Sequence, residues 1–195
     1  FAPSDLERSV KESLVKLRLS EVDLLLLHWP NPEVPLSETM AALCKMKRIG
    51  CAKHIGVSNF TVKLIEAAVQ FATEPLVTNQ VECHPYIDQS KVIAASRRHG
   101  LAVTAYSPIA RGRVARDETL IRIGQAHAKT ATQAALRYLV QQGIVVIPRT
   151  TRVERLAENM DIFDFELTDG EMAEIRALAR PDGRIVNTAW SPRWD

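Results

Sequence analysis

Strand-like and helix-like segments alternate along this chain, and this alternation constrains the possible folds more than any other feature. Five short apolar segments are predicted as strands, and each lies next to stretches in which apolar residues recur at helical spacing. The predicted strands cover residues 22–27, 55–57, 77–81, 102–106 and 144–147. Repeated βαβ units of this kind predict an α/β protein with a parallel sheet and right-handed crossovers.

The predicted helices carry boundary signals. Ser4 with Glu7, and Thr130 with Gln133, have the spacing of a capping box, which marks a helix start. Gly50 is placed to end a helix. The helices are expected to begin near residue 4 and to cover 36–47, 62–71, 90–99, 118–128, 132–142, 153–159 and 169–179. Residues 181–195 show no period, so we expect one domain over residues 1–195 that ends in an ordered surface tail.

Two parallel architectures compete, an open doubly wound sheet and a closed barrel. The chain contains no G-x-G, so the glycine fingerprint of dinucleotide-binding open sheets is absent. A (β/α)8 barrel needs eight strands and typically about 250 residues. The sequence opens in a helix with no strand before it, so a barrel interpretation implies five βα units here and three units before residue 1.

Composition and charge exclude several classes of protein. Lys and Arg number 25 against 23 Asp and Glu, so the net charge of +2 does not favour a nucleic-acid binder or a protein of the membrane surface. The run of leucines at 24–27 is far shorter than the ~20 apolar residues of a membrane span. The three cysteines lack C-x-x-C spacing, which argues against disulfides and structural zinc. We therefore expect a metal-free protein of the reducing cytoplasm.

Polar residues follow each predicted strand, at the edge where parallel α/β folds place their ligands. Together they suggest one ligand-binding site, although each residue also has a purely structural interpretation. His28 could transfer a proton or simply pack at a strand end. Tyr106 could stack on a flat ring or fill a barrel mouth. Arg149, Arg152 and Arg155 could bind a phosphate or form a solvated basic turn.

Five stretches of the sequence strongly resemble the aldo-keto reductases, in the order of that family. They are VDLLLLHWP (22–30), HIGVSNF (54–60), TNQVECHPY (78–86), TAYSPIARG (104–112) and VIPRTTRVERLAEN (146–159). Bacterial diketogluconate reductases look especially similar. The resemblance implies a (β/α)8 TIM barrel, of which this chain would supply the fourth strand onward.

The resemblance also implies a site that binds NADP(H). The implied cofactor residues are Ser58, Asn59 and Gln80 at the nicotinamide carboxamide, Tyr106 on the nicotinamide ring, Ser107 at the pyrophosphate, Arg149, Thr150 and Arg155 at the 2′-phosphate, and Glu158 and Asn159 at the adenine. Many family members carry lysine where this chain has Arg149. Because the positive charge is kept while its geometry changes, NADP preference is still expected.

For the reaction itself, the resemblance implies that His28 orients the carbonyl of a small substrate, beside a pocket wall that includes Trp29 and Trp190. The family's proton-donating tyrosine, with its lysine and aspartate, comes from the first three strands and has no counterpart in this sequence. We therefore expect an NADP-dependent carbonyl reductase, monomeric when full length, of which this chain alone is inactive. The alternatives are a non-catalytic cofactor-binding barrel, such as an auxiliary channel subunit, and an α/β domain that binds another phosphate ligand.

Overall fold

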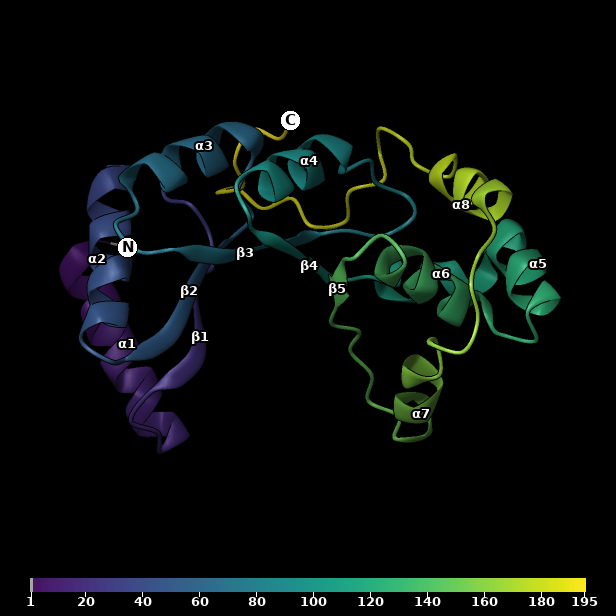
Figure 1. Cartoon of the computed structure of the whole chain (residues 1–195), viewed down its shortest axis with the longest axis horizontal. Coiled ribbons are helices and arrows are strands. Elements are labelled where there is room, and N and C mark those ends of the chain that lie inside the picture. The colour runs from purple at the N-terminus through teal and green to yellow at the C-terminus, as the bar shows by residue number, and fades with distance from the viewer. Residues whose placement is uncertain (1) are drawn as a thin grey trace. The chain divides into compact units, whose positions relative to one another are not determined.

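The computed structural model describes residues 2–195 and divides the chain into two compact units (Figure 1). Unit 1 contains the residues up to 80, residues 91–102 and residues 188–195. Unit 2 contains residues 81–90 and 103–187. Every described strand pairing is parallel and joins strands that are consecutive in the chain, which confirms the predicted α/β class.

Unit 1 places helices along the outside of its strands (Figure 1). The elements that lie wholly or mostly in it are α1 (Pro3–Leu17), β1 (Val22–Leu27), α2 (Leu36–Arg48), β2 (Ala52–Ser58), α3 (Val62–Phe71), β3 (Leu76–Glu82) and α4 (Ser90–Arg98). Strand β2 pairs with β1 through Gly56 opposite Leu26, and with β3 through Ser58 opposite Gln80. This register brings the carboxyl ends of the three strands to one edge.

Gly56 is required where these strands approach most closely. A Cβ atom at this position would lie 2.7 Å from the carbonyl oxygen of Thr78 and 2.9 Å from Cδ2 of Leu26. No side chain larger than hydrogen fits there unless the strands separate. Around it, unit 1 buries Met40, Phe60 and other apolar side chains almost completely, so the strand ends stand on a packed core.

Unit 2 is built around α6, whose residues are almost all buried. Its elements are β4 (Ala102–Tyr106), the 3₁₀ segment η1 (Ala110–Arg116), α5 (Glu118–Ala126), α6 (Ala131–Val140), β5 (Val145–Val146), α7 (Glu154–Met160) and α8 (Asp169–Arg176). Strand β4 pairs with β5, with Thr104 opposite Val145. Helix α6 contacts η1, α5, β5, α7 and α8, so it fixes the positions of the loops that follow β4 and β5.

The capping box predicted at Thr130 is confirmed. The Thr130 side chain accepts from the Gln133 backbone N–H, and the Gln133 side chain accepts from the Thr130 backbone N–H. The box predicted at Ser4 is wrong. Helix α1 begins at Pro3, whose fixed φ suits the first helical turn, and Ala2 is the N-cap without a side-chain bond. The carboxylate of Glu7 instead accepts from two lysine side chains, at 2.8 and 2.7 Å.

Two other local features differ from the sequence-based expectation. Strand β5 contains two residues where four were predicted. The η1 segment was not predicted, and its turn depends on Arg111 and Gly112, which both have positive φ. Across residues 2–195, no helix is long and apolar enough to cross a membrane, and no cluster of three or more potential metal ligands occurs.

Candidate functional site

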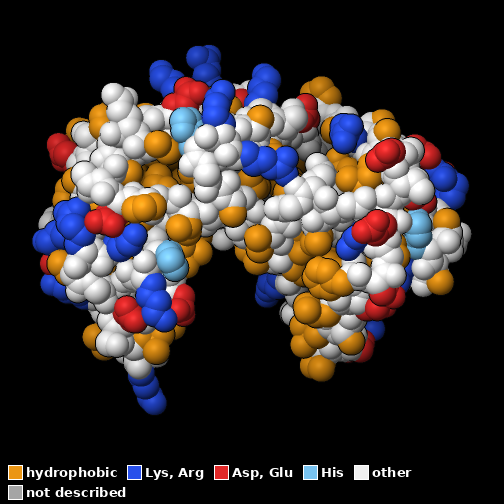
Figure 2. All heavy atoms as spheres, viewed as in Figure 1, with side chains coloured by type: hydrophobic (Ala, Val, Ile, Leu, Met, Phe, Trp, Pro, Cys, Tyr) orange, Lys and Arg blue, Asp and Glu red, His pale blue; other side chains and the backbone are white. Residues whose placement is uncertain are grey.

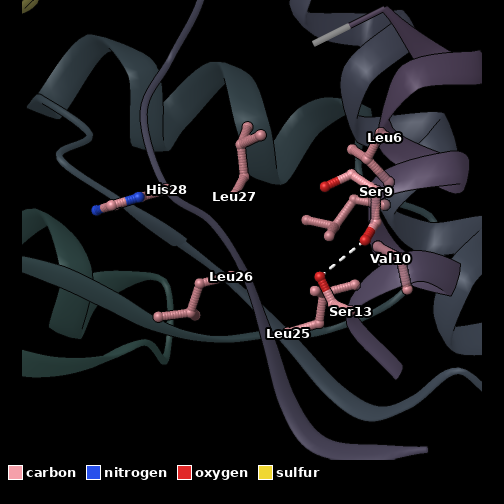
Figure 3. A pocket seen from close by; sticks show the side chains of 9 residues that line it. Leu6, Ser9, Val10, Ser13, Leu25, Leu26, Leu27 and His28 are labelled. Atoms are coloured by element: carbon pink, nitrogen blue, oxygen red, sulfur yellow. Dashed lines mark hydrogen bonds between the residues drawn. The ribbon is translucent and has the colours of Figure 1, made fainter. Parts of the chain in front are cut away.

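His28 follows β1 directly, at the carboxyl end of the strand. Side chains alternate along a strand, and in Figure 3 Leu26 and His28 point away from α1 while Leu25 faces Ser13 of that helix. A cavity of about 270 Å³ lies between α1 and β1 and is lined mainly by leucine and other apolar side chains. His28 is exposed, and it is also among the residues that line this cavity.

The ends of β2 and β3 meet His28 through a hydrogen-bonded group. The Ser58 hydroxyl donates to the backbone carbonyl of Gln80 at 2.8 Å, and the Asn59 N–H donates to the same oxygen at 2.8 Å. The Asn59 side-chain amide donates to the backbone carbonyl of His28 at 3.0 Å. Asn59 has a φ of +62°, a left-handed conformation that asparagine adopts more readily than most residues. The structure therefore brings these four sequence-predicted residues together in unit 1.

Aromatic side chains stand beside His28, although one of them was not predicted. The Trp29 ring lies 6.3 Å from the His28 ring and meets Trp194 edge-on at 6.2 Å. Trp190, which the sequence resemblance suggested as a pocket wall, is 62% exposed. The Asp195 carboxylate accepts from the Val62 N–H at 2.9 Å and so holds the end of the chain. The only sequence signal for Trp194 was its position in a tail rich in tryptophan.

Tyr106 and Ser107 lie at the end of β4 in unit 2. Burial, followed by the negative charge of Glu82, raises the pKa of Tyr106 to about 12, so its phenol stays protonated near neutral pH. The backbone carbonyl of Tyr106 accepts from the Cys83 N–H at 3.3 Å. Ser107 has a φ of +52°, which turns the chain sharply after the strand. A neutral, half-buried ring of this kind can stack on a flat ligand.

The five residues that the family resemblance assigns to the cofactor between 149 and 159 line one pocket of unit 2, with a volume of about 620 Å³. These residues are Arg149, Thr150, Arg155, Glu158 and Asn159. The opposite wall comes from η1, α5 and the loop before α6, and it includes Arg116 and Lys129, which the sequence analysis missed. The pocket therefore has three guanidinium or hydroxyl donors that were predicted and two further cations.

The charges around this pocket are not equivalent. Arg152 does not line the pocket and instead pairs with Glu154 at 2.7 Å, while the Thr150 hydroxyl donates to the Arg152 carbonyl. Lys129 lines the pocket but forms ion pairs with Asp161 and Asp164, each at 2.8 Å, and these pairs raise its pKa. Arginines form bidentate, charge-assisted bonds to phosphate oxygens. The cations left for an anionic ligand are therefore chiefly arginines.

Comparison with known proteins identifies the family. The family model "Aldo/keto reductase family" matches residues 1–180. The chain belongs to the aldo/keto reductases. Methylglyoxal reductase DkgB of Escherichia coli O157:H7 is 38% identical over 190 residues, which cover 96% of this chain and 71% of that reductase. Glyoxal reductase of Bacillus subtilis (strain 168) is 37% identical over 172 residues, or 88% of this chain and 62% of the relative.

Solved structures confirm the barrel prediction for this aldo/keto reductase chain. A crystal structure assigned to 2,5-diketo-D-gluconic acid reductase B covers the whole chain with a TM-score of 0.97 and 49% identity, and 70% of that structure is matched. A Bombyx mori aldo-keto reductase in complex with NADP covers 96% of the chain with a TM-score of 0.87 and 32% identity, with 66% of that structure matched. The five βα units are therefore part of a (β/α)8 barrel fold.

Proposed function

We propose that the chain binds NADP(H) and belongs to an enzyme that reduces an aldehyde or ketone to an alcohol. The observation that carries this proposal is the pocket in unit 2, where Arg149, Thr150, Arg155, Glu158 and Asn159 converge. Its donor set fits the group that the family implies, because guanidinium and hydroxyl groups suit a phosphate ester while an amide and a carboxylate suit an adenine edge.

Arg149 and Arg155 are the residues proposed to select NADP over NAD. Among residues 2–195 neither guanidinium forms a salt bridge, whereas Arg152 is paired with Glu154. An unpaired arginine in a pocket attracts a dianionic 2′-phosphate, which NAD lacks. The Thr150 hydroxyl lies beside them, and it would donate to a phosphate oxygen only by releasing the Arg152 carbonyl.

The other sequence-predicted residues of each unit keep their cofactor assignments. Ser58, Asn59 and Gln80 are proposed to hold the carboxamide, and Tyr106 to stack on the ring with Ser107 at the pyrophosphate. When bound, NADPH supplies the hydride for carbonyl reduction. His28 is proposed to hold the carbonyl oxygen in place by donating a hydrogen bond from its exposed imidazole.

Protonation of the product oxygen has no assigned group in this chain. Tyr86 donates its hydroxyl to Asp117 at 3.1 Å, and burial raises its pKa. Burial also raises the pKa of Tyr138, whose side chain is 8% exposed. Tyr106 is assigned to the cofactor. We therefore propose that the 195 residues bind cofactor but do not turn over a carbonyl substrate by themselves.

A non-catalytic cofactor-binding subunit was the main alternative. The relatives reported above are named as reductases of methylglyoxal and glyoxal, which favours an enzyme and small carbonyl substrates. The test is a titration of the chain with NADPH and NADH, followed by fluorescence, together with an assay of NADPH oxidation with methylglyoxal. We expect tight NADPH binding, weaker NADH binding and no turnover. Absence of NADPH binding would refute the proposed cofactor site.

A further inference from the structure

A buried carboxylate in unit 2 receives three hydrogen bonds, and none of the roles proposed above uses it. Glu82, the last residue of β3, is 1% exposed. Its carboxylate accepts from the N–H of Ile185 at 2.6 Å, from the N–H of Val186 at 2.8 Å and from Nε2 of His84 at 2.9 Å. The two backbone donors lie in the C-terminal tail, more than 100 residues from Glu82 along the chain.

The tautomer of His84 follows from its neighbours. The Tyr86 N–H points at Nδ1 of His84, with a separation of 3.3 Å, so that nitrogen accepts and Nε2 carries the hydrogen. Both side chains of the Glu82–His84 pair are fully buried. The Gln89 side chain donates to the backbone carbonyl of Glu82 at 2.7 Å and so holds the main chain at Glu82.

The tail segment 180–186 is fitted closely to the loop after β3. The Arg180 N–H donates to the Tyr86 carbonyl at 3.2 Å, and the Arg180 guanidinium lies 5.1 Å from the centre of the Tyr86 ring. A Cβ atom at Gly183 would lie 1.7 Å from the same Tyr86 carbonyl oxygen. Only glycine allows the tail to pass this close to the Tyr86 carbonyl, so the sequence specifies the close contact between the tail and the loop.

Burying a charged carboxylate is costly unless several donors satisfy it. Here the donors are two consecutive backbone N–H groups and a neutral imidazole, which together fit one carboxylate and no apolar side chain. The arrangement therefore specifies one path for the tail. Residues 188–195 follow this segment in the chain. They include Trp194, whose ring contacts Trp29, the neighbour of His28.

We propose that Glu82, oriented by His84, is a positioning residue that clamps the C-terminal tail and thereby holds Trp194 as a wall for aromatic carbonyl substrates. The clamp stands on the hydrogen bonds described here, while the substrate part rests on the proposed function. An edge-on tryptophan pair beside a hydrogen-bond donor favours a flat apolar substrate body with its carbonyl toward His28.

The first test is Glu82→Gln, which keeps the shape but replaces one acceptor oxygen with an NH2 donor. That group would face either the Val186 N–H, or both the Ile185 N–H and the imidazole N–H, so at least one of the three bonds becomes a donor–donor contact. Limited proteolysis of the full chain with trypsin reports on the tail through cleavage after Arg184. We expect cleavage there to be about tenfold faster or more. An unchanged rate would overturn the clamp.

A matched control is Glu171→Gln, which weakens the other histidine–glutamate pair of unit 2, with His127 at 2.9 Å, without touching the tail. Both variants lower thermal stability, but only Glu82→Gln should accelerate cleavage after Arg184. Equal acceleration in both would show general loosening and overturn the clamp.

Ligand binding separates the clamp from the proposed function. With NADP⁺ present, 4-nitrobenzaldehyde binding is followed by quenching of tryptophan fluorescence, and NADPH binding is measured in parallel. We expect Glu82→Gln to weaken the aldehyde about fivefold or more and NADPH less than twofold. Unchanged aldehyde affinity would overturn the substrate role of the tail. If the parent chain binds no NADPH, the proposed function fails, whereas the proteolysis result still decides the clamp.

Discussion

At the scale of single residues, two arginines three positions apart differ in what they contact. Arg152 pairs with Glu154, whereas Arg155 lines the pocket of unit 2. Replacing Arg155 with alanine should weaken NADPH binding about tenfold or more, because a charge-assisted bond to phosphate is worth about 1.5–3 kcal/mol. NADH affinity should stay within about twofold. The measurement is fluorescence titration with both cofactors.

Arg152→Ala is the matched control for this prediction, since it removes the same charge just before α7 but not from the pocket. We expect little change in NADPH affinity from it. A similar loss for NADPH and NADH in Arg155→Ala would mean that this arginine supports the local structure of α7 and does not recognise the 2′-phosphate.

The buried carboxylate of Glu82 makes stability depend on pH. Burial alone would raise the pKa of Glu82, but hydrogen bonds from His84, Ile185 and Val186 outweigh it, and the net effect lowers the pKa below 4.5. A depressed pKa in the folded state contributes stability above the unfolded value and loses it as pH falls through the folded value. The free energy of unfolding should therefore drop as pH falls below about 4.5.

Denaturant titrations between pH 7 and pH 3 check this expectation. In Glu82→Gln the free energy of unfolding should be lower at pH 7 and should change less steeply with pH over the acid range. A variant whose pH dependence is as steep as that of the parent chain would assign the acid sensitivity to other carboxylates, such as Glu7, whose two lysine partners lower its pKa to about 2.

At the scale of elements, the N-terminus of α6 connects helix capping with the cofactor pocket. The Thr130 side chain caps α6, and its hydroxyl also donates to the Glu158 carboxylate at 2.9 Å. Thr130→Ala should lower stability by about 1 kcal/mol through loss of the cap. It should also weaken NADPH binding about threefold or more, because Glu158 loses its partner at the pocket wall. Thermal unfolding and NADPH titration measure the two effects.

Thr168 provides the control, because it forms the same capping box with Glu171 at α8 and does not line the pocket. Thr168→Ala should cost about as much stability as Thr130→Ala and leave NADPH affinity unchanged. If both variants weaken NADPH equally, the loss reflects stability and the link between Thr130 and the cofactor is wrong.

At the scale of the whole molecule, the chain exposes apolar surface beside a short strand. In unit 2, apolar side chains gather over β5 and α7 (Figure 2), next to an apolar cavity of about 390 Å³. Val145 is 51% exposed and Phe163 63% exposed. Exposed edge strands with apolar neighbours tend to pair with another chain. We expect the 195-residue chain to self-associate, as measured by sedimentation velocity over a range of concentrations.

A charge on the edge strand should reduce this association, because lysine on an edge disfavours strand pairing. Val145→Lys is the variant, and Val15→Lys on α1 is its control, since Val15 is 77% exposed but lies on a helix. A monomer with a cooperative thermal transition in the parent chain would contradict the prediction.

Local signals in the sequence were sufficient for the parallel α/β class and for most helices. Apolar periodicity reports which face of a segment is buried, and the Thr130–Gln133 box depends only on neighbouring residues. The same locality explains the failures. Ser4 and Glu7 have the spacing of a cap, yet Pro3 already starts the helix and Glu7 reaches Lys45, 38 residues away.

The sequence by itself also indicated the family and the set of candidate residues, because five of its stretches resemble aldo-keto reductase motifs. Only the tertiary structure decided what those residues contact. It separated Arg155 from Arg152, placed Trp194 against Trp29, and brought Ile185 to Glu82. Hydrogen bonds and ring contacts between residues far apart in the chain depend on distances of a few ångströms that packing alone sets, and no spacing along the sequence encodes them.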